Sequence, residues 1–433
     1  MGKYVFFMTA IITLASLSAG LADTLSPKDK LLLAGADPRI EKIRKADAAI
    51  LVTYPDDSPA KGVKVKVEQV NHRFLFGCNI FPLYTYKDEQ HDTYGKEFAD
   101  LLNYATLPFY WGAYESKPGV TNAEGVKKIA EWCKAHGIET KGHPLVWHLV
   151  YPGWAPSDVD ETRARLESRV SGIVRDFKGL INRWDVVNEA TVSAGVDNGV
   201  GHWTKRDGAA KMVDESLRWA REANSRATLL YNDFNVSSDF EKLVGDLNQM
   251  NSPYDVIGIQ SHMHGSEWSM EKAWDVCDTY AKFGKPIHFT ELTVLSGENG
   301  WEKPAPWPTT PEGEKHQAAY VSRLYTLLFS HPAVEAITWW DFMDGGWQGA
   351  PAGLVRVDLT PKPAYKSLMA LIKRKWWTRL DTRTADDGIC KIRGFMGKYK
   401  VTVTTPNGSK TALFDLAPGR NVWNIELAGP KGK

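Results

Sequence analysis

The sequence has few cysteines, no excess of either charge and a single long apolar run. Its 433 residues include four cysteines, and no two of them form a Cys-x-x-Cys pair. This spacing excludes a zinc site of paired cysteines and a disulfide framework, and we expect at least two buried thiols. The cysteines are Cys78, Cys133, Cys277 and Cys390. With 53 basic and 52 acidic residues the net charge is +1, so no global basic field exists to hold nucleic acid.

The apolar run lies near the N-terminus. Lys3 is the one charge before it, the run covers residues 4–17, and small residues follow up to Ala22. This order predicts a secretory signal over residues 1–22, with cleavage after Ala22. We therefore expect a secreted or periplasmic protein, with an uncleaved anchor as the alternative. No other stretch is long and apolar enough to cross a bilayer, so we expect no membrane span after the signal is removed.

The remaining composition is typical of a globular chain. Hydrophobic residues make up 43% and charged residues 24%, which excludes wholesale disorder. Tryptophan is the one unusual count, at 17. Large rings beyond the needs of a core often serve as flat binding platforms, and packing inside the core is their alternative role.

From residue 74 onward, short strand-like apolar runs alternate with longer amphipathic stretches. Eight such units fit an α/β fold of the (β/α)8 TIM barrel type, which we expect over residues 74–375. A doubly wound sheet is the alternative, but no glycine-rich phosphate loop follows the first strand. The expected strands lie near residues 74–80, 104–108, 139–147, 183–188, 228–232, 256–260, 286–290 and 336–340. The helical stretches lie at 126–136, 161–178, 209–225, 270–283 and 314–330.

Both ends of the chain outside the barrel also have strand-like patterns. Residues 23–73 are expected to form a lead-in helix and a β-hairpin, whose second strand alternates with period two. Residues 376–433 carry four strand-like runs separated by glycine turns. These runs predict a small C-terminal β-module, with the N-terminal hairpin as a candidate to complete it.

Two glutamates stand at the ends of expected strands. Glu189 closes the fourth strand and Glu291 the seventh. In this kind of barrel the carboxyl ends of the strands carry the catalytic groups. A strand-end salt bridge is the alternative for either glutamate alone, but it explains two of them less well. Two carboxylates across a sugar site are the minimum machinery of glycoside hydrolysis: one protonates the leaving oxygen, and the other attacks the anomeric carbon or activates water.

Six short motifs occur in an order typical of one enzyme family. They are KGHPLVWH at 141–148, WDVVNEA at 184–190, NDFN at 232–235, GIQSH at 258–262, TEL at 290–292 and PKPAY at 361–365. Together they resemble glycoside hydrolase family 10, the retaining β-1,4-xylanase family, over residues 74–372. Each motif alone is weak, but the ordered set is specific.

The resemblance implies an endo-1,4-β-xylanase that cleaves xylan or xylo-oligosaccharides without a cofactor. Glu189 matches the general acid/base and Glu291 the nucleophile. The other matches bind substrate: Asn188 at the sugar 2-hydroxyl, His143 and Trp147 at the floor of the −1 subsite, Gln260 and His262 around the nucleophile, Trp339 as the aromatic wall on strand eight, and Trp347 as a weaker match. His262 and His264 form a His-x-His pair, but no third ligand is evident, so we expect no metal. We expect a monomer whose partner is a polysaccharide or oligosaccharide.

The sequence departs from the family where the glycone sugars are gripped. In the family's Glu-Asn-Glu-Met-Lys-Trp stretch after strand two, the first Glu, the Asn and the Lys are here Thr106, Leu107 and Tyr110. The glutamine three residues after the strand-three tryptophan is Val150, and the tyrosine of Asn-Asp-Tyr-Asn is Phe234. A site that loses such groups loses discrimination for the hydroxyls they served. We expect a −2 subsite that is more apolar, blocked or rebuilt for another glycan.

A second departure lies beside the nucleophile. The family reads Thr-Glu-Leu-Asp, and that Asp orients the histidine that contacts the nucleophile; here the position is Thr293. Threonine supplies no negative charge to hold His262, so we expect an altered pH dependence and not inactivity. Asp341 and Asp344 are candidates to supply the charge instead.

Three functions stay open on the sequence alone. The leading one is a secreted retaining β-glycosidase, an endo-β-1,4-xylanase or xylo-oligosaccharidase. The second keeps the fold and mechanism on another β-linked glycan or glycoside. The third is a non-catalytic carbohydrate-binding barrel, which the tryptophans suit and the two intact glutamates oppose. The C-terminal module is either a carbohydrate-binding unit or a cap on the barrel, and packing is the favoured role of its tryptophans. These are Trp376, Trp377 and Trp423.

Overall fold

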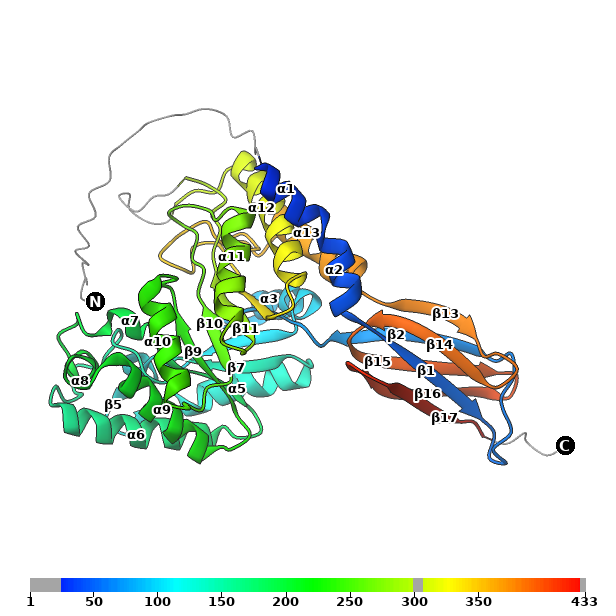
Figure 1. Ribbon diagram of the computed structural model, residues 1–433, viewed down its shortest axis with the longest axis horizontal. Helices are drawn as coiled ribbons and strands as arrows, with labels where there is room; N and C mark the ends of the chain where they lie inside the picture. The colour runs from blue at the N-terminus through cyan, green and yellow to red at the C-terminus, as the bar shows by residue number, and fades with distance from the viewer. Residues whose placement is uncertain (1–24, 299–306, 429–433) are drawn as a thin grey trace.

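The computed structural model describes residues 25–298 and 307–428, which form a barrel joined to a smaller all-β body (Figure 1). The signal predicted over residues 1–22 lies outside these described residues. Within them, no helix has the length and apolar character needed to span a membrane. All four cysteines are buried and free of disulfides.

Eight parallel strands close into a barrel, which confirms the predicted (β/α)8 fold. Strands β3, β10 and β11 are buried along their whole length, because helices cover them outside and side chains fill the barrel within. The strands are β3 (Leu75–Asn79), β4 (Tyr104–Pro108), β7 (Glu139–His143), β8 (Arg183–Asn188), β9 (Thr228–Asp233), β10 (Val256–Ile259), β11 (Ile287–Leu292) and β12 (Val334–Trp339).

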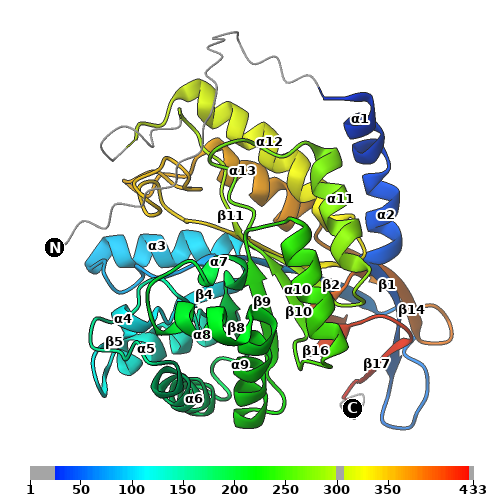
Figure 2. The same cartoon turned by 60° about the vertical axis from the view of Figure 1, so that its left-hand side comes forward.

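Amphipathic helices surround the barrel (Figure 2). Helix α6 is an example: Asp158 caps its N-terminus by accepting from first-turn amides, and the buried Leu166, Val170 and Val174 recur every fourth residue. The outer helices are α3 (Asp88–Leu101), α5 (Ala123–Ala135), α6 (Val159–Asp176), α9 (Ala209–Ala223), α10 (Ser238–Gln249), α11 (Met270–Ala281), α12 (Pro311–Phe329) and α13 (Pro363–Ala370), which continues into a π-helical turn (Leu371–Lys375). The loops add α4 (Trp111–Tyr114), α7 (Ala190–Ser193), α8 (Gly199–Asp207), β5 (Glu115–Lys117) and β6 (Val120–Thr121).

Strands from both ends of the chain form a two-layer sandwich beside the barrel. One sheet has the order β14–β1–β17 and the other β13–β2–β15–β16. Burial alternates along β1, β15 and β17, and the inward faces of the sandwich, which include Ile50, Val67 and Val401, make a second core. The strands are β1 (Lys45–Thr53), β2 (Lys64–His72), β13 (Arg379–Arg383), β14 (Ile389–Phe395), β15 (Gly397–Thr405), β16 (Gly408–Leu416) and β17 (Asn421–Glu426).

The predicted N-terminal hairpin is wrong. Strand β1 pairs with β14 and β17, whereas β2 pairs with β13 and β15 in the other sheet. Each strand has one apolar face, so the two meet face to face across the core and hydrogen-bond with C-terminal strands at their edges. The expected single lead-in helix is two helices, α1 (Pro27–Ala34) and α2 (Ala36–Ile43), which pack against α11 and α12 (Figure 1).

The sandwich adjoins the amino-terminal ends of the barrel strands. A crevice of about 710 Å³ between the two bodies is lined by the starts of barrel strands and by residues of β15 and β16. Trp376 is buried and stacks on Phe76, with ring centroids 6.0 Å apart. Trp377 packs edge-on to His72, and Trp423 is buried. All three C-terminal tryptophans therefore have packing contacts.

Candidate active site

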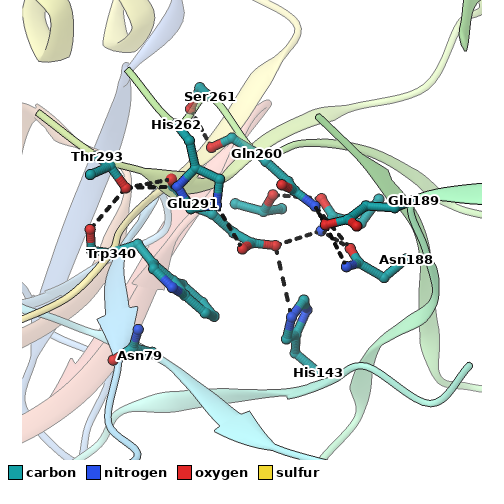
Figure 3. A network of polar contacts seen from close by, with 12 residues as sticks. Asn79, His143, Asn188, Glu189, Gln260, Ser261, His262, Glu291, Thr293 and Trp340 are labelled. Carbon is teal, nitrogen blue, oxygen red and sulfur yellow. Dashed lines mark hydrogen bonds and ion pairs between the residues drawn. The ribbon is translucent and has the colours of Figure 1, made fainter. Parts of the chain in front are cut away.

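Polar side chains at the carboxyl ends of the barrel strands converge on a cavity of about 810 Å³ at the mouth (Figure 3). Glu189 directly follows β8 and Glu291 lies near the end of β11. Both line the cavity, together with the predicted Trp147 and Trp347. The other predicted residues that line it are His143, Asn188, Gln260 and His262.

Glu189 is held at a sharp turn between β8 and α7. Its backbone is left-handed, with a φ of 57°, a conformation uncommon outside glycine. Its carboxylate accepts hydrogen bonds from Trp147 Nε1 at 2.9 Å, Gln260 Nε2 at 2.8 Å and Asn188 Nδ2 at 3.1 Å. Burial raises the pKa of Glu189, and the charge of Glu291 adds to the rise against the opposing hydrogen bonds.

Glu291 is buried and sits in a more positive setting. Its carboxylate accepts from Asn232 Nδ2 at 2.8 Å, and His262 Nε2 lies 3.2 Å away. His143 Nε2 lies 3.8 Å from Glu291 Oε1. Burial alone would raise the pKa of Glu291, but His143 and His262 outweigh it, so the net pKa is lowered.

One hydrogen-bond network joins the two carboxylates. Gln260 Nε2 lies 2.8 Å from Glu189 and 3.2 Å from Asn188 Oδ1. The same Asn188 oxygen accepts from Asn232, at 2.8 Å, and Asn232 also donates to Glu291. The two carboxylates thus share one network, and their pKa values are shifted in opposite directions.

A buried ion pair between Lys141 and Asp185 holds His143 in place. His143 Nδ1 lies 2.7 Å from Asp185 Oδ2, and Lys141 Nζ lies 2.5 Å from the same oxygen. Burial would raise the pKa of Asp185, but Lys141 and His143 lower it. Sequence reasoning assigned no role to Asp185, Lys141 or Asn232. The signal that could have identified these three residues is their position within the sequence motifs at the strand ends.

The aromatic wall on strand eight is one residue away from its predicted place. Trp339 is fully buried and donates from Nε1 to the carbonyl of Ala352 at 2.8 Å, so it belongs to the core. Trp340 lines the cavity instead, edge-on to His143 at 5.4 Å between ring centroids. Trp347 stacks on His262 at 5.0 Å. Successive residues of a strand point to opposite faces, so a shift of one residue moves the ring from wall to core.

Thr293 lies beside His262, at the position where the resemblance implies a carboxylate. His262 Nδ1 lies 2.8 Å from Thr293 Oγ1, which donates to the carbonyl of Trp340 at 2.9 Å. Asp344 is not the substitute, because it pairs with the buried Lys362 at 2.8 Å. Asp341 accepts from Asn79, and burial raises the pKa of Asp341 to about 6.

The replaced glycone residues do not all reach the cavity. Thr106 and Leu107 are fully buried within β4. Tyr110 and Val150 line the cavity, as does Phe234. Within the described residues, no group of three or more His, Cys, Asp or Glu side chains is arranged to hold a metal ion.

Residues 70–371 match the sequence profile of glycosyl hydrolase family 10. The chain belongs to this family. The family assignment and the closed barrel together make it a glycoside hydrolase with a (β/α)8 fold.

Similar proteins include several with xylanase names. Endo-1,4-beta-xylanase B of Thermotoga neapolitana is 28% identical over 284 residues, covering 61% of this chain and 78% of that protein. Native xylanase 10B from Thermotoga maritima has a similar structure, with a TM-score of 0.60 and 26% identity over 70% of this chain and 96% of that one.

Other relatives are much longer than this chain. Anti-sigma-I factor RsgI6 of Acetivibrio thermocellus is 27% identical over 383 residues, which are 87% of this chain and 47% of that protein. Endo-1,4-beta-xylanase 2 of Arabidopsis thaliana is 25% identical over 88% of this chain and 34% of that protein. The chain thus spans half or less of these relatives.

Proposed function

We propose that this glycoside hydrolase cleaves β-1,4-xylosidic bonds in xylan or xylo-oligosaccharides with retention of configuration. Glu189 is the acid/base and Glu291 the nucleophile. The observation that carries the proposal is the pair of glutamates at the mouth, joined by one network and shifted to opposite pKa directions. Environments that push two pKa values apart assign the acid and the ionised role. The xylan substrate is proposed from the names of the relatives.

In the first step the ionised Glu291 attacks the anomeric carbon. The glycosidic C–O bond breaks, and its oxygen takes the proton of Glu189, so the leaving sugar departs neutral. A covalent glycosyl–Glu291 ester and an ionised Glu189 result. The raised pKa of Glu189 favours the protonated form that this step needs, and the lowered pKa of Glu291 favours the ionised form.

In the second step a water molecule replaces the leaving sugar. Glu189 takes one proton from this water as its oxygen attacks the anomeric carbon, and the bond to Glu291 breaks. Esterified Glu291 has no charge, so the pKa of Glu189 falls in the intermediate and suits the carboxylate to act as a base. The two inversions leave the original configuration and return both groups to their starting states.

Asn188 is proposed to bind the sugar 2-hydroxyl. Its Oδ1 accepts from Gln260 and Asn232, which fixes the amide so that Nδ2 lies on the side of Glu189. His143 and Trp147 form the floor beneath this sugar, and Trp340 and Trp347 offer apolar ring faces to it. A donor held by two bonds needs no reorganisation during reaction.

We further propose that the protein is exported as a monomer. The pattern of residues 1–22 supports cleavage after Ala22. N-terminal sequencing of the exported protein should begin at Asp23, and size-exclusion chromatography should give a mass near that of one chain.

A different β-linked glycan is the second candidate, and Tyr110 and Val150 at the cavity favour it. The test is incubation of the mature protein with xylans, xylo-oligosaccharides and other β-glycans, with product sizes followed beside the Glu291→Ala variant. Short xylo-oligosaccharides released by the wild type alone would support the proposal. Products from another glycan only would favour the second candidate, and no product from any substrate would overturn both.

A further inference from the structure

The two glutamates divide the mouth of the barrel into two arcs. Between β8 and β11, β9 and β10 lie on one side and β12, β3, β4 and β7 on the other. The resemblance to the family implies that the stretch that grips the glycone follows strand two, which is β4 here. Given the function proposed above, on which this inference rests, the glycone lies over the longer arc.

Four largely apolar side chains line the cavity at the end of this arc. Tyr110 and Ala113 come from the loop after β4, and Leu149 and Val150 from the loop after β7. The two loops touch, because Gly112 N donates to Val150 O at 2.7 Å. Val150 is 46% exposed, although large apolar side chains are normally covered. We call these four residues the apolar shelf.

The apolar shelf is held in place by its surroundings. Val150 has a φ of 50°, a left-handed conformation that β-branched residues rarely adopt. A Cβ atom at Gly112 would lie 2.8 Å from Val150 O, so only glycine permits this close approach. Local strain of this kind persists where the surrounding structure imposes it, and it is common at ligand sites.

The apolar shelf offers little to a second sugar. Its one polar side-chain group is the Tyr110 hydroxyl, which lies within electrostatic reach of Glu291 and Glu189. The Tyr110 ring packs against His143 and Trp147 at 5.4 and 5.5 Å between centroids. Hydroxyls placed on Val150 and Leu149 would give up their bonds to water without replacement, which is unfavourable.

A single hydroxyl donor beside an apolar surface complements an acyl ester. We propose that the apolar shelf binds an O-acyl group carried by the glycone, so that the enzyme prefers ester-substituted over unsubstituted oligosaccharides. The ester carbonyl accepts from the Tyr110 hydroxyl, and the acyl methyl or aryl group packs on Val150, Leu149 and Ala113. Acetyl and arylacyl esters share this chemistry.

The test compares xylo-oligosaccharides that differ only in an O-acyl group on the glycone. The measured quantity is the ratio of kcat/KM for the esterified over the unsubstituted compound, in an acetyl arm and a cinnamoyl arm. We expect a ratio of about five or more for the wild type in at least one arm, the value of one hydrogen bond with its apolar contact. A high ratio in one arm alone identifies the acyl source.

Variants locate the effect on the apolar shelf. Val150→Gln and Tyr110→Phe should each lower the ratio toward one, since they remove the apolar contact and the donor respectively. Leu413→Gln is the matched control: Leu413 is an exposed apolar residue of the sandwich, 75% accessible, and its change should leave the ratio as in the wild type.

The outcomes separate this inference from the proposed function. Hydrolysis of both compounds with a wild-type ratio of one or less in both arms overturns the acyl site and leaves the glycosidase intact. A high ratio that neither shelf variant lowers also overturns it. Absence of hydrolysis on every compound would overturn the proposed function and with it this inference.

Discussion

The barrel has a cavity at each end, and their volumes are similar, at about 810 and about 710 Å³. At the amino-terminal crevice the charges serve the fold. Arg44 donates to three backbone carbonyls, and Arg183 pairs with Glu139 at 2.7 Å in a partly exposed site. At the mouth, two glutamates share a network and have opposite pKa shifts.

The comparison teaches that cavity volume does not distinguish the two ends of this barrel. Reactivity depends on titratable groups whose environments push their pKa values apart. The carboxyl ends of the strands provide such environments, because loops and helix starts meet there.

The largest expected effect follows Glu291→Ala. Loss of the nucleophile should lower kcat by about 10⁴-fold or more on xylan. The matched control is Glu335→Ala, which removes an exposed carboxylate at the amino-terminal crevice and should leave kcat unchanged. Initial-rate measurements of reducing-sugar release compare the two, and near-normal turnover by Glu291→Ala would refute the account.

Glu189→Ala should have a large effect that depends on the leaving group. We expect kcat to fall by about 10²–10⁴-fold on xylo-oligosaccharides, the usual contribution of a general acid. On an aryl glycoside whose phenol leaves without protonation, the first step should be nearly normal, and added azide should restore turnover. Equal losses on both substrates would contradict the acid role of Glu189.

Trp423→Ala tests the other body of the molecule. Trp423 is buried in the sandwich and stacks on Phe414, with centroids 5.1 Å apart. Its removal should lower the free energy of unfolding by about 3–5 kcal/mol, measured by denaturant unfolding, while kcat stays normal at low temperature. A loss of kcat with unchanged stability would instead tie the sandwich to catalysis.

The smallest expected effect concerns pH. Glu291 must be ionised, so kcat/KM is lost as pH falls through its lowered pKa; Glu189 must be protonated, so kcat/KM is lost as pH rises through its raised pKa. The profile should therefore be a bell with limbs on either side of 4.5, the ordinary value for both groups.

Thr293→Asp places an anion beside His262 and should move the limbs of this pH profile by a few tenths to one pH unit. An unmoved profile would show that His262 needs no charged partner.

Much of the barrel could be predicted because its strands and helices have strong local patterns. Runs such as Val256–Ile259 are apolar and short, and Ala209–Ala223 has a clear apolar stripe. Helix α3 was missed, since only Tyr94, Phe98 and Leu101 mark its buried face among largely polar residues. The pairing of β1 with β14 joins residues more than 300 positions apart, and no local pattern specifies such a partner.

Site residues could be predicted where a carboxylate side chain stands at the end of a predicted strand. Glu189 and Glu291 meet this condition, and the structure brings both to the mouth. Trp339 and Trp340 are adjacent and identical, so only the exact end of β12 decides which one faces the cavity. The apolar shelf depends on a contact between two loops, at Gly112 and Val150, which sequence spacing cannot reveal.

The most direct test of the central claim is the configuration of the first-formed product. Proton NMR of a xylo-oligosaccharide digest, recorded before the anomers equilibrate, distinguishes the two outcomes. The account predicts the β-anomer, because Glu291 and then water each invert the anomeric carbon. Initial release of the α-anomer would mean a single displacement by water and would contradict the nucleophilic role of Glu291.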